Sequence, residues 1–386
     1  MDDTGKRRQL DNIYVSGKTT TLDDFFAYTQ AGGSVAQAGS NLLYGMNQSK
    51  TTGAAPVNND TQGFVFFTRP MLNLTKANLI RKREMHYLLT TRETSVQRYV
   101  RCTLDPSLAT FASPVVKSPL VDNKMAFIPL FSNTILKLSG WPDVVAPTYK
   151  SKQGLRKEQW ALIDGTAEVN ESFDMDATFK NTADEPLPMM IDAWVNYATY
   201  VFDGQLRPHY GMEVRNEIDY TTRIYRFVMD KDERYIKKVA CTVASFPINS
   251  QTGKFFDYDR TQQYMSQSKE INVRFTSMGA VYNDDIILKW FNLAAGYANS
   301  ALREIVVGNF VSPAKNHYEK IPRELLAKFK FAGYPLVNTL TYELEWWIDP
   351  MSSTYKHVMN EFNPTTPVPV DAAAVKKTID KLNTKI

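Results

Sequence analysis

The sequence is poor in the side chains that most often bind metals or take part in catalysis. Its 386 residues include only four histidines (His86, His209, His317 and His357) and two cysteines (Cys102 and Cys241). No two of these six residues have the short spacing of a metal-binding motif. This scarcity lowers the expectation of an enzyme without removing it. We predict no catalytic residue, no metal site and no cofactor.

Long apolar runs and a strong net charge are also absent. No run approaches the roughly 18 consecutive apolar residues of a membrane span. Residues 1–8 carry charges with no apolar segment behind them, so we expect no signal peptide. The net charge of +4 is too small to predict binding to nucleic acid. We therefore expect a protein made in the cytosol, with reduced cysteines and no membrane partner.

Three short strings imitate functional motifs but lack a required part. Residues 16–19 (Ser-Gly-Lys-Thr) look like the end of a phosphate-binding loop, but Asn12 stands where that loop needs glycine. The acidic residues of 230–233 lack the ligand spacing and the central glycine of a calcium loop, so a hairpin turn is favoured. Asp174 and Asp176 fall on the solvated side of a strand, which argues against a glycosidase pair.

Basic residues gather between positions 81 and 101, where they could contact phosphate groups. The cluster consists of Arg81, Lys82, Arg83, Arg92, Arg98 and Arg101. Glu84 and Glu93 interrupt it, so a solvated or subunit-contacting helix face is the favoured interpretation. His209 is expected to pack or to lie at the surface.

Aromatic residues are abundant, at 12% of the chain, and several segments alternate as strands do. In residues 171–180 the apolar side chains fall at odd positions and polar ones at even positions, which predicts an antiparallel strand with one wet face. We expect further strands at 219–229 and 235–246, joined by the turn at 230–233. Others are expected at 63–68, 270–276 and 340–348, the last with Leu340, Tyr342, Leu344, Trp346 and Ile348 on one face.

Helical spacing appears in three places. After Pro186 the apolar residues follow three- and four-residue steps up to Val201, and Asp203-Gly204 ends the pattern. Asp284 and Asp285 predict the cap of a second helix. Residues 75–101 are expected to be helical or mixed, beginning at a Thr75 cap.

The chain divides into three predicted regions. Residues 1–60 form an N-terminal arm, because the small polar residues of 31–60 cannot offset their ordering entropy by their own burial. This arm either packs on a neighbouring subunit or remains a disordered tail. Residues 61–350 form a β-rich core, with 102–160 as a candidate inserted loop region. Residues 351–386 form a linker and a C-terminal helical arm, with a proline-spaced stretch at 363–370 and a helix at 371–383.

The order of elements in residues 160–295 resembles that of tail-tube and tube-initiator proteins of contractile-tailed bacteriophages, especially the long virion proteins of large phages. The segments that carry the resemblance are Phe173–Phe179, Trp194–Tyr197, Ala244–Ile248, Gly253–Asp257, Ile271–Phe275, Gly279–Asn283 and the earlier Phe66–Leu74. The resemblance covers about half of the chain and depends on order and composition instead of one invariant motif.

The resemblance implies an α+β, β-rich fold of two packed antiparallel sheets, a sandwich or barrel with flanking helices and extended terminal arms. It also implies a hexameric ring whose sheets join across subunits around a lumen. A ring would satisfy edge strands that a single copy leaves exposed, and head-to-tail contacts can close such a ring. The strand residues expected at subunit contacts or at the lumen are Phe173, Asp174, Met175, Asp176, Phe179, Ile271, Val273, Phe275, Tyr342 and Trp346.

These expectations favour a non-enzymatic virion structural protein of the tail tube or of the baseplate–tube junction, assembled in the host cytoplasm. Its expected partners are further copies of itself, adjacent tube, sheath or baseplate hub proteins, and tape-measure protein and DNA held in the lumen without sequence-specific binding. Three alternatives remain open. They are a head–neck connector or other capsid-associated structural protein, a baseplate-associated hydrolase, and a sheet-rich bacterial binding protein unrelated to phages.

Overall fold

We describe the fold from a computed structural model, which describes residues 61–109, 117–165, 172–182, 184–258, 260–261, 269–307, 318–329 and 332–362. These residues belong to one compact unit, Gln62–Ile386, apart from Thr61 at its boundary. The predictions for residues 1–60 and for the helix at 371–383 concern residues outside these ranges.

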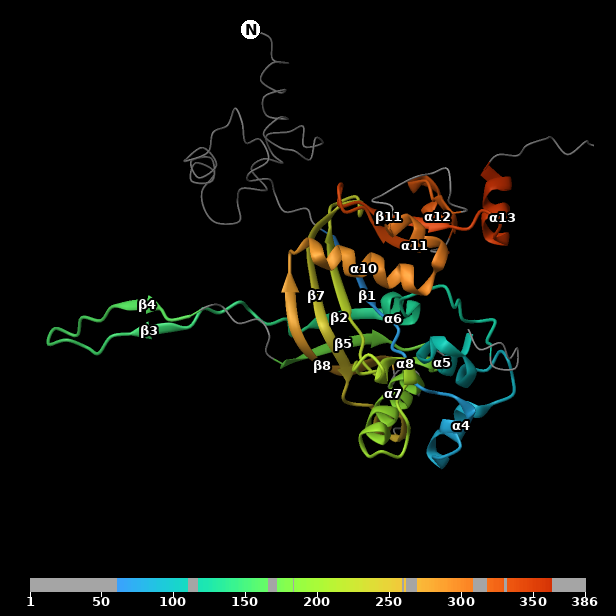
Figure 1. Cartoon of the computed structure of the whole chain (residues 1–386), viewed down its shortest axis with the longest axis horizontal. Coiled ribbons are helices and arrows are strands. Elements are labelled where there is room, and N and C mark those ends of the chain that lie inside the picture. Colours follow the sequence, from blue (N-terminus) through green and yellow to red (C-terminus); the bar gives the residue numbers. More distant parts are fainter. Residues whose placement is uncertain are drawn as a thin grey trace, which may run out of the picture. The chain divides into compact units, whose positions relative to one another are not determined.

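The centre of the unit is a six-stranded sheet with the strand order β1-β6-β7-β8-β5-β2 (Figure 1). Its strands are β1 (Thr61–Phe67), β2 (Ile135–Ser139), β5 (Ser172–Lys180), β6 (Ile224–Met229), β7 (Ile236–Pro247) and β8 (Glu270–Tyr282). The pairings from β6 across to β2 are all antiparallel. The β-rich α+β class predicted from the sequence is thus confirmed.

The six-stranded sheet curls over and encloses a hydrophobic core that contains Phe67, Phe179 and Phe275. The first part of β8 pairs with β5 and its second part pairs with β7, so β8 joins the two halves. Phe67 of β1 lies 5.9 Å from Phe179 of β5 and 5.7 Å from Phe275 of β8, measured between ring centroids. Strands far apart in the sheet order therefore face each other. The sheet is not a closed barrel, because β1 and β2 remain its two edges.

This core is covered by α4 (Lys76–Leu79), η2 (Arg83–Leu89), α5 (Val96–Leu104), α6 (Pro129–Thr134) and the long helix α7 (Pro186–Phe202). The short helices η3 (Pro106–Ala109), α8 (Tyr210–Glu213) and η5 (Thr252–Phe256) contribute no described residue to it. Trp194 of α7 is fully buried and stacks on Phe131 of α6. Its indole also donates a hydrogen bond to the carbonyl of Tyr220, which fixes α7 beside the start of β6.

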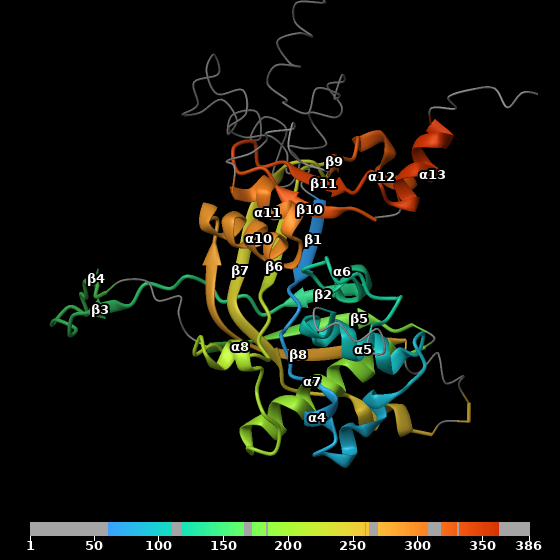
Figure 2. The ribbon, with the colours of Figure 1, turned by 45° about the vertical axis from the view of Figure 1, so that its right-hand side comes forward.

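The C-terminal part adds a second layer of elements at the other end of β6 (Figure 2). It consists of α10 (Asp285–Ala298), α11 (Ser300–Val307), β9 (Glu319–Lys320), η6 (Arg323–Leu325), α12 (Leu326–Phe329), β10 (Tyr334–Val337), β11 (Leu344–Ile348) and α13 (Ser353–Phe362). The three strands form a small sheet of order β10-β11-β9. Phe291 of α10 contacts Phe66 and Phe127, so this part shares an aromatic core with the large sheet.

Most strand and helix predictions within the described residues are confirmed. The helix expected after Pro186 is α7 and ends at Phe202, with Asp203 at its C-terminal cap position. The turn at 230–233 joins β6 to β7, and the Asp284 side chain caps α10 by accepting from the backbone N–H of Ile286. Segment 75–101 is mixed, as expected. Thr75 stands at the cap position of α4, but its hydroxyl donates to Asn73 and makes no cap bond.

Two predictions in the C-terminal part were wrong. The strand expected at 340–348 begins only at Leu344, because Tyr342 takes a left-handed φ of 57° in a turn and Leu340 is exposed. Residues 351–386 were predicted to begin as a linker and to become helical only at 371, yet Ser353–Phe362 already forms α13. Cys102 and Cys241 are both buried, and no disulfide joins them.

Candidate assembly surfaces

A polar sheet face runs across β2, β5 and β8, and we call it the polar face. The register places Asp174 opposite Thr276 and Asp176 opposite Arg274, all with outward side chains. Asp176 Oδ1 lies 3.1 Å from Arg274 Nε, and the Thr276 hydroxyl donates to Asp174 Oδ1 at 2.8 Å. The predicted wet face of segment 171–180 therefore exists and continues onto the neighbouring strand.

The charges of the polar face are balanced. Its exposed charged residues are Asp174, Asp176, Glu270, Lys137, Lys180 and Arg274. Three acidic and three basic side chains give no net charge, and the register sets Lys180 opposite Glu270. A face with paired charges of both signs offers no continuous basic track to a nucleic-acid backbone.

The ten residues predicted at contacts or at a lumen separate into an inward and an outward group. The side chains of Met175, Phe179, Ile271, Val273 and Phe275 are buried in the core of the chain itself. Phe173 and Trp346 are partly buried against the cores. Outward side chains are those of Asp174, Asp176 and Tyr342, the last donating to Asp285 of α10. These strands can contact another molecule only through their outward side chains, and that role stays a prediction.

The strand β2 is an open edge of the large sheet. It pairs with β5 on one side, and no other described strand pairs with its second side. Leu136 on this strand is exposed. An unpaired edge of this kind is a ready template for a strand from another chain.

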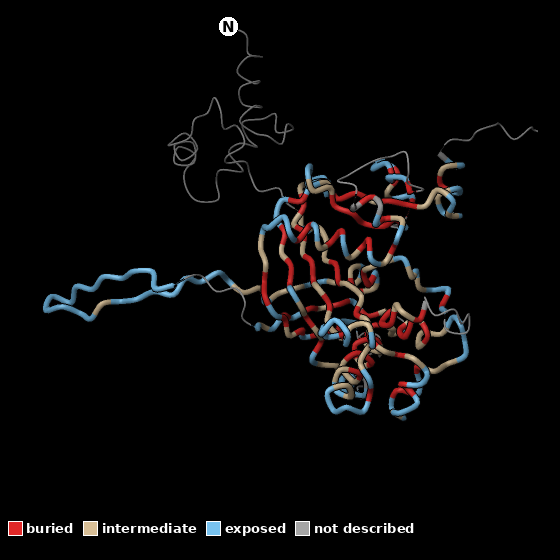
Figure 3. The backbone as a smooth tube through the Cα atoms, in the orientation of Figure 1, coloured by how far each residue is buried: buried red, intermediate tan, exposed pale blue. Residues whose placement is uncertain are grey.

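Among the described residues, the longest exposed segment is the hairpin of β3 (Thr148–Lys150) and β4 (Ala161–Ile163), which we call the arm (residues 143–165). Every residue of the arm is exposed except the half-buried Ser151 (Figure 3). Its exposed large apolar side chains are Val144, Val145, Tyr149, Leu155, Trp160, Leu162 and Ile163. An isolated two-stranded hairpin is at best marginally stable in water, so we expect the arm to pack on another molecule.

The tip of the arm is held in one shape by its own hydrogen bonds. The backbone N–H of Gly154 donates to the carbonyl of Glu158 at 3.0 Å, and Lys157 takes a left-handed φ of 62°. Leu155 at this tip is fully exposed, between the cations of Lys152 and Arg156. The tip thus presents an apolar anchor beside positive charge without further ordering of its backbone.

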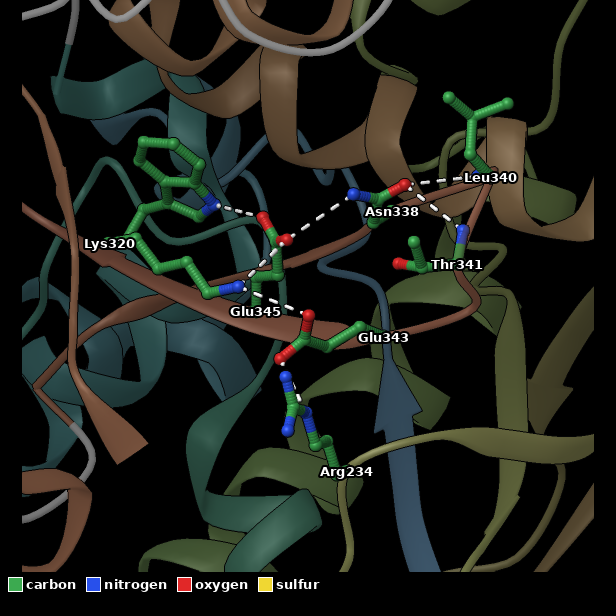
Figure 4. A network of polar contacts seen from close by, with 8 residues as sticks. Arg234, Lys320, Asn338, Leu340, Thr341, Glu343 and Glu345 are labelled. Atoms are coloured by element: carbon green, nitrogen blue, oxygen red, sulfur yellow. Dashed lines mark hydrogen bonds and ion pairs between the residues drawn. The ribbon is translucent and has the colours of Figure 1, made fainter. Parts of the chain in front are cut away.

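A polar network joins the small sheet to the turn between β6 and β7 (Figure 4). Lys320 Nζ lies 3.2 Å from Glu343 Oε2 and 3.0 Å from Glu345 Oε1, and Arg234 Nε lies 3.0 Å from Glu343 Oε1. Hydrogen bonds from Lys320 and Arg234 hold the pKa of the Glu343 carboxyl below its usual value, against its desolvation. The buried Glu345 also accepts from the indole of Trp347, so the network fixes β11 in place.

The predicted basic cluster does not form one surface. Arg98 and Arg101 are buried, and each donates to a backbone carbonyl, Arg98 to Thr90 and Arg101 to Leu74. These two cations serve the packing of α5 against its neighbours, which corrects the expectation of a continuous exposed or phosphate-binding face. His209 is half-buried, and its Nδ1 accepts from the backbone N–H of Gly211 at the start of α8.

Among the described residues no group of three or more His, Cys, Asp or Glu side chains is arranged to hold a metal ion. Burial raises the pKa of the Cys241 thiol to about 12, so it is protonated at neutral pH. Within the same residues, no helix has the length and apolar character needed to cross a membrane.

The sequence analysis did not predict the hairpin of the arm, because residues 102–160 were interpreted as a candidate inserted loop region. A signal was present, since Gly154 lies between two runs that hold Tyr149, Trp160 and Leu162. Glycine between two β-type runs is typical of a hairpin. Neither run alternates long enough to stand out beside the regular strands.

Comparison with known proteins gives one family match. The family profile described as "Putative phage tail tube protein" matches residues 5–363. A solved structure described as "Cryo-EM structure of the anti-feeding prophage cap (AFP tube terminating cap)" aligns at 9% identity and a TM-score of 0.25, covering 41% of this chain and 82% of that one. A TM-score this low does not establish a common fold. No curated protein sequence matches the chain significantly.

Proposed function

The chain belongs to the phage tail tube protein family, and from this premise we propose that its copies assemble into a hexameric ring of the tail tube or of the baseplate–tube junction. The family is one of structural proteins, so the role is architectural instead of catalytic. The ring would be a conduit for DNA and tape-measure protein in the virion tail, with tube, sheath or baseplate hub proteins as neighbours.

The observation that carries this proposal is the arm. A single copy leaves seven large apolar side chains of residues 143–165 in solvent, on a hairpin that packs on no described part of the chain. Full burial of each such side chain stabilises an assembly by about 1.5–3 kcal/mol. Burial of these side chains against a second copy would therefore stabilise the assembly strongly. The open edge of β2, which leads into the arm, offers a strand-pairing site beside it.

Electron microscopy of negatively stained purified protein tests the proposal. Six-fold rings, or tubes built from them, are the expected particles. A variant in which a short Gly-Ser turn replaces residues 144–164 should remain folded but yield monomers only. Twelve-fold rings of the intact protein would favour a head–neck connector instead, and monomers at high concentration would contradict ring assembly.

For the lumen we propose the polar face of β2, β5 and β8. Its balanced charges support this role, because a lumen without net positive charge does not hold the phosphate backbone of passing DNA. The variant Asp174→Lys with Asp176→Lys would leave Arg274 among added cations and should slow DNA delivery from otherwise normal tails. Glu213→Lys with Glu217→Lys, on exposed residues at the end of α8 and just after it, is the control. If the Asp174→Lys, Asp176→Lys variant delivered DNA at the unchanged rate, the proposal that the polar face lines the lumen would be contradicted.

A further inference from the structure

The tip of the arm (residues 150–158) carries a surplus of positive charge around its apolar anchor. Its exposed charged residues are the cations Lys150, Lys152, Arg156 and Lys157 and the carboxylate Glu158, which gives a net charge of +3. Leu155 is fully exposed among them. The Glu158 carboxylate accepts from the backbone N–H of Arg156 at 2.8 Å, so it belongs to the turn itself. A partner for this tip therefore needs an apolar contact surrounded by negative charge.

The base of the arm is fixed to the large sheet. Trp141 lies 6.0 Å from Tyr282 of β8, measured between ring centroids, and the Tyr282 hydroxyl donates to the carbonyl of Pro142 at 2.6 Å. Beyond this point every residue of the arm except Ser151 is exposed. The extended chain from the base to Leu155 spans roughly 40 Å. The tip is thus presented to another molecule, because the described part of its own chain does not cover it.

One end of the chain has the composition that the tip requires, and we call it the acidic end (residues 230–235, 283–286 and 339–343). Hydrogen bonds hold its three segments together. The carbonyl of Tyr342 accepts from the N–H of Ile236 at 2.9 Å, and the Tyr342 hydroxyl donates to Asp285 at 2.6 Å. The side chain of Asn338 accepts from the backbone N–H of Leu340 at 3.0 Å and holds the turn that carries it (Figure 4).

The acidic end exposes apolar side chains and a surplus of negative charge. Leu340, Ile286, Tyr235 and Tyr342 are exposed by 79%, 40%, 37% and 37%. Its carboxylates are those of Asp230, Asp232, Glu233, Asp284, Asp285 and Glu343. They face three cations, Lys231, Arg234 and, paired with Glu343 from β9, Lys320, so three negative charges remain. Among the described residues, Asp232 and Glu233 have no ion-pair partner.

A second exposed apolar region of the chain lacks this charge. Residues 207–218, which include α8, expose Tyr210, Val214 and Ile218 by 78%, 64% and 45%. The charged residues of this region are two arginines and two glutamates, Arg207, Arg215, Glu213 and Glu217. Apolar contact alone would suit the arm tip to either region. Charge complementarity distinguishes them, because it steers association and disfavours wrong partners.

We propose that the arm tip of one copy docks on the acidic end of another copy, with Leu155 against the exposed apolar side chains and the tip cations beside Asp232 and Glu233. This assignment rests on the proposed role of the arm in assembly and names the surface that receives it. The tip and the acidic end are different surfaces, so the contact is heterologous. Repeated contacts of this kind close into a ring or continue as a stack.

Charge reversal tests the pairing. Lys152→Glu with Arg156→Glu, and separately Asp232→Lys with Glu233→Lys, should each weaken the association of full-length chains at least about tenfold in sedimentation. All four substitutions together should restore association, because the two surfaces are complementary again. Glu213→Lys with Glu217→Lys makes the same change of charge in residues 207–218 and should leave association unchanged. Absence of restoration, or an equal loss in the control, would overturn the assignment.

Mixing two defective variants separates the docking from ring formation. Leu155→Asp removes the anchor of the tip and Leu340→Asp alters the acidic end, so each variant alone should remain monomeric. In a mixture the native tip of one variant meets the native acidic end of the other only once, so dimers of mixed composition are expected and nothing larger. A mixture that stays monomeric would overturn the docking.

The two proposals fail in different ways. Mixed dimers from a protein that builds no ring would contradict ring assembly and support the docking. Rings built as well by the Asp232→Lys, Glu233→Lys variant as by the unchanged protein would overturn the docking and leave ring assembly standing.

Discussion

Arg69 shows how one half-buried cation organises the segments around it. Its guanidinium donates to the backbone carbonyls of Cys102, Thr103 and Met125, at 2.6, 2.9 and 3.2 Å. The first two are carbonyls of the last turn of α5, which a cation stabilises through the helix dipole. Desolvation lowers the pKa of Arg69 to about 10, so it stays charged at neutral pH. Arg69 thereby joins the end of α5 to the chain that leads into α6.

Glu343 makes the docking of the small sheet sensitive to acid. Its pKa lies below the usual value of 4.5, so its contribution to the free energy of unfolding is complete above that value and is lost as the pH falls below it. Glu343→Gln should cost about 1–3 kcal/mol at pH 7, because Arg234 and Lys320 lose a charged acceptor. It should also flatten the fall in stability between pH 5 and pH 3, measured by urea unfolding.

Glu361 provides the control for that measurement. It is an exposed carboxylate on α13 whose ion-pair partner is His357. Glu361→Gln should leave both the stability at pH 7 and its slope with pH close to those of the unchanged protein. A Glu343→Gln protein with the unaltered acid slope would show that the network does not hold the small sheet.

For single residues, the sequence predicts burial correctly where apolar and polar side chains alternate regularly. It does not predict burial that depends on backbone groups far away in the sequence. Alternation in segment 171–180 assigns Met175 and Phe179 to the core and Asp174 to the solvent, and the structure agrees. The burial of Arg98 and Arg101 was not predictable, because their acceptors are carbonyls brought near only by the tertiary fold. The same reason applies to Arg69.

Among the elements, β2 leaves the sheet at a glycine that no other residue can replace without strain. Gly140 has a φ of 103°, and a Cβ there would lie 2.4 Å from the carbonyl oxygen of Asp174 on β5. The close contact with rigid backbone lets the chain turn from β2 toward the arm directly beside β5. Gly140 thus determines where the arm begins.

Gly140→Ala should therefore lower the free energy of unfolding by more than about 2 kcal/mol, because it adds a steric clash to an unfavourable φ. Gly204→Ala is the matched control, since Gly204 also has a positive φ, of 70°, but no atom lies within 4 Å of its added Cβ. That variant should lose about 1 kcal/mol from backbone strain alone. Equal losses in chemical denaturation would contradict the contact between Gly140 and β5.

Elements were predictable from the sequence when they bury one regular face in their own chain. This holds for α7, for β5 and for the β6–β7 hairpin, whose turn residues are adjacent in sequence. The pairing of β2 with β5 was not predictable, because 32 residues separate Ser139 from Ser172 and no local signal fixes the register. The arm and α13 bury few residues in the described chain, so they lack the apolar period on which prediction depends.

In the whole molecule, the cores and the candidate contact surfaces are built from different residues. Two aromatic cores centred on Phe67 and Phe291 hold the large sheet and the C-terminal part together. The arm, the edge of β2 and the polar face lie outside both cores. Substitutions on these surfaces should therefore change assembly and leave the fold of a single copy intact, which makes the proposed function testable separately from stability.

Leu155 offers the sharpest test of that separation. Its side chain is fully exposed at the tip of the arm, so Leu155→Asp should leave the melting temperature of the monomer within about 2 °C. If the tip enters an apolar site on another copy, a buried unpaired carboxylate there costs several kcal/mol and should abolish rings and tubes. Gln153→Asp adds a negative charge two residues away and should permit assembly, because Gln153 supplies no apolar anchor. Rings formed equally well by both variants would show that the arm tip does not hold the assembly together.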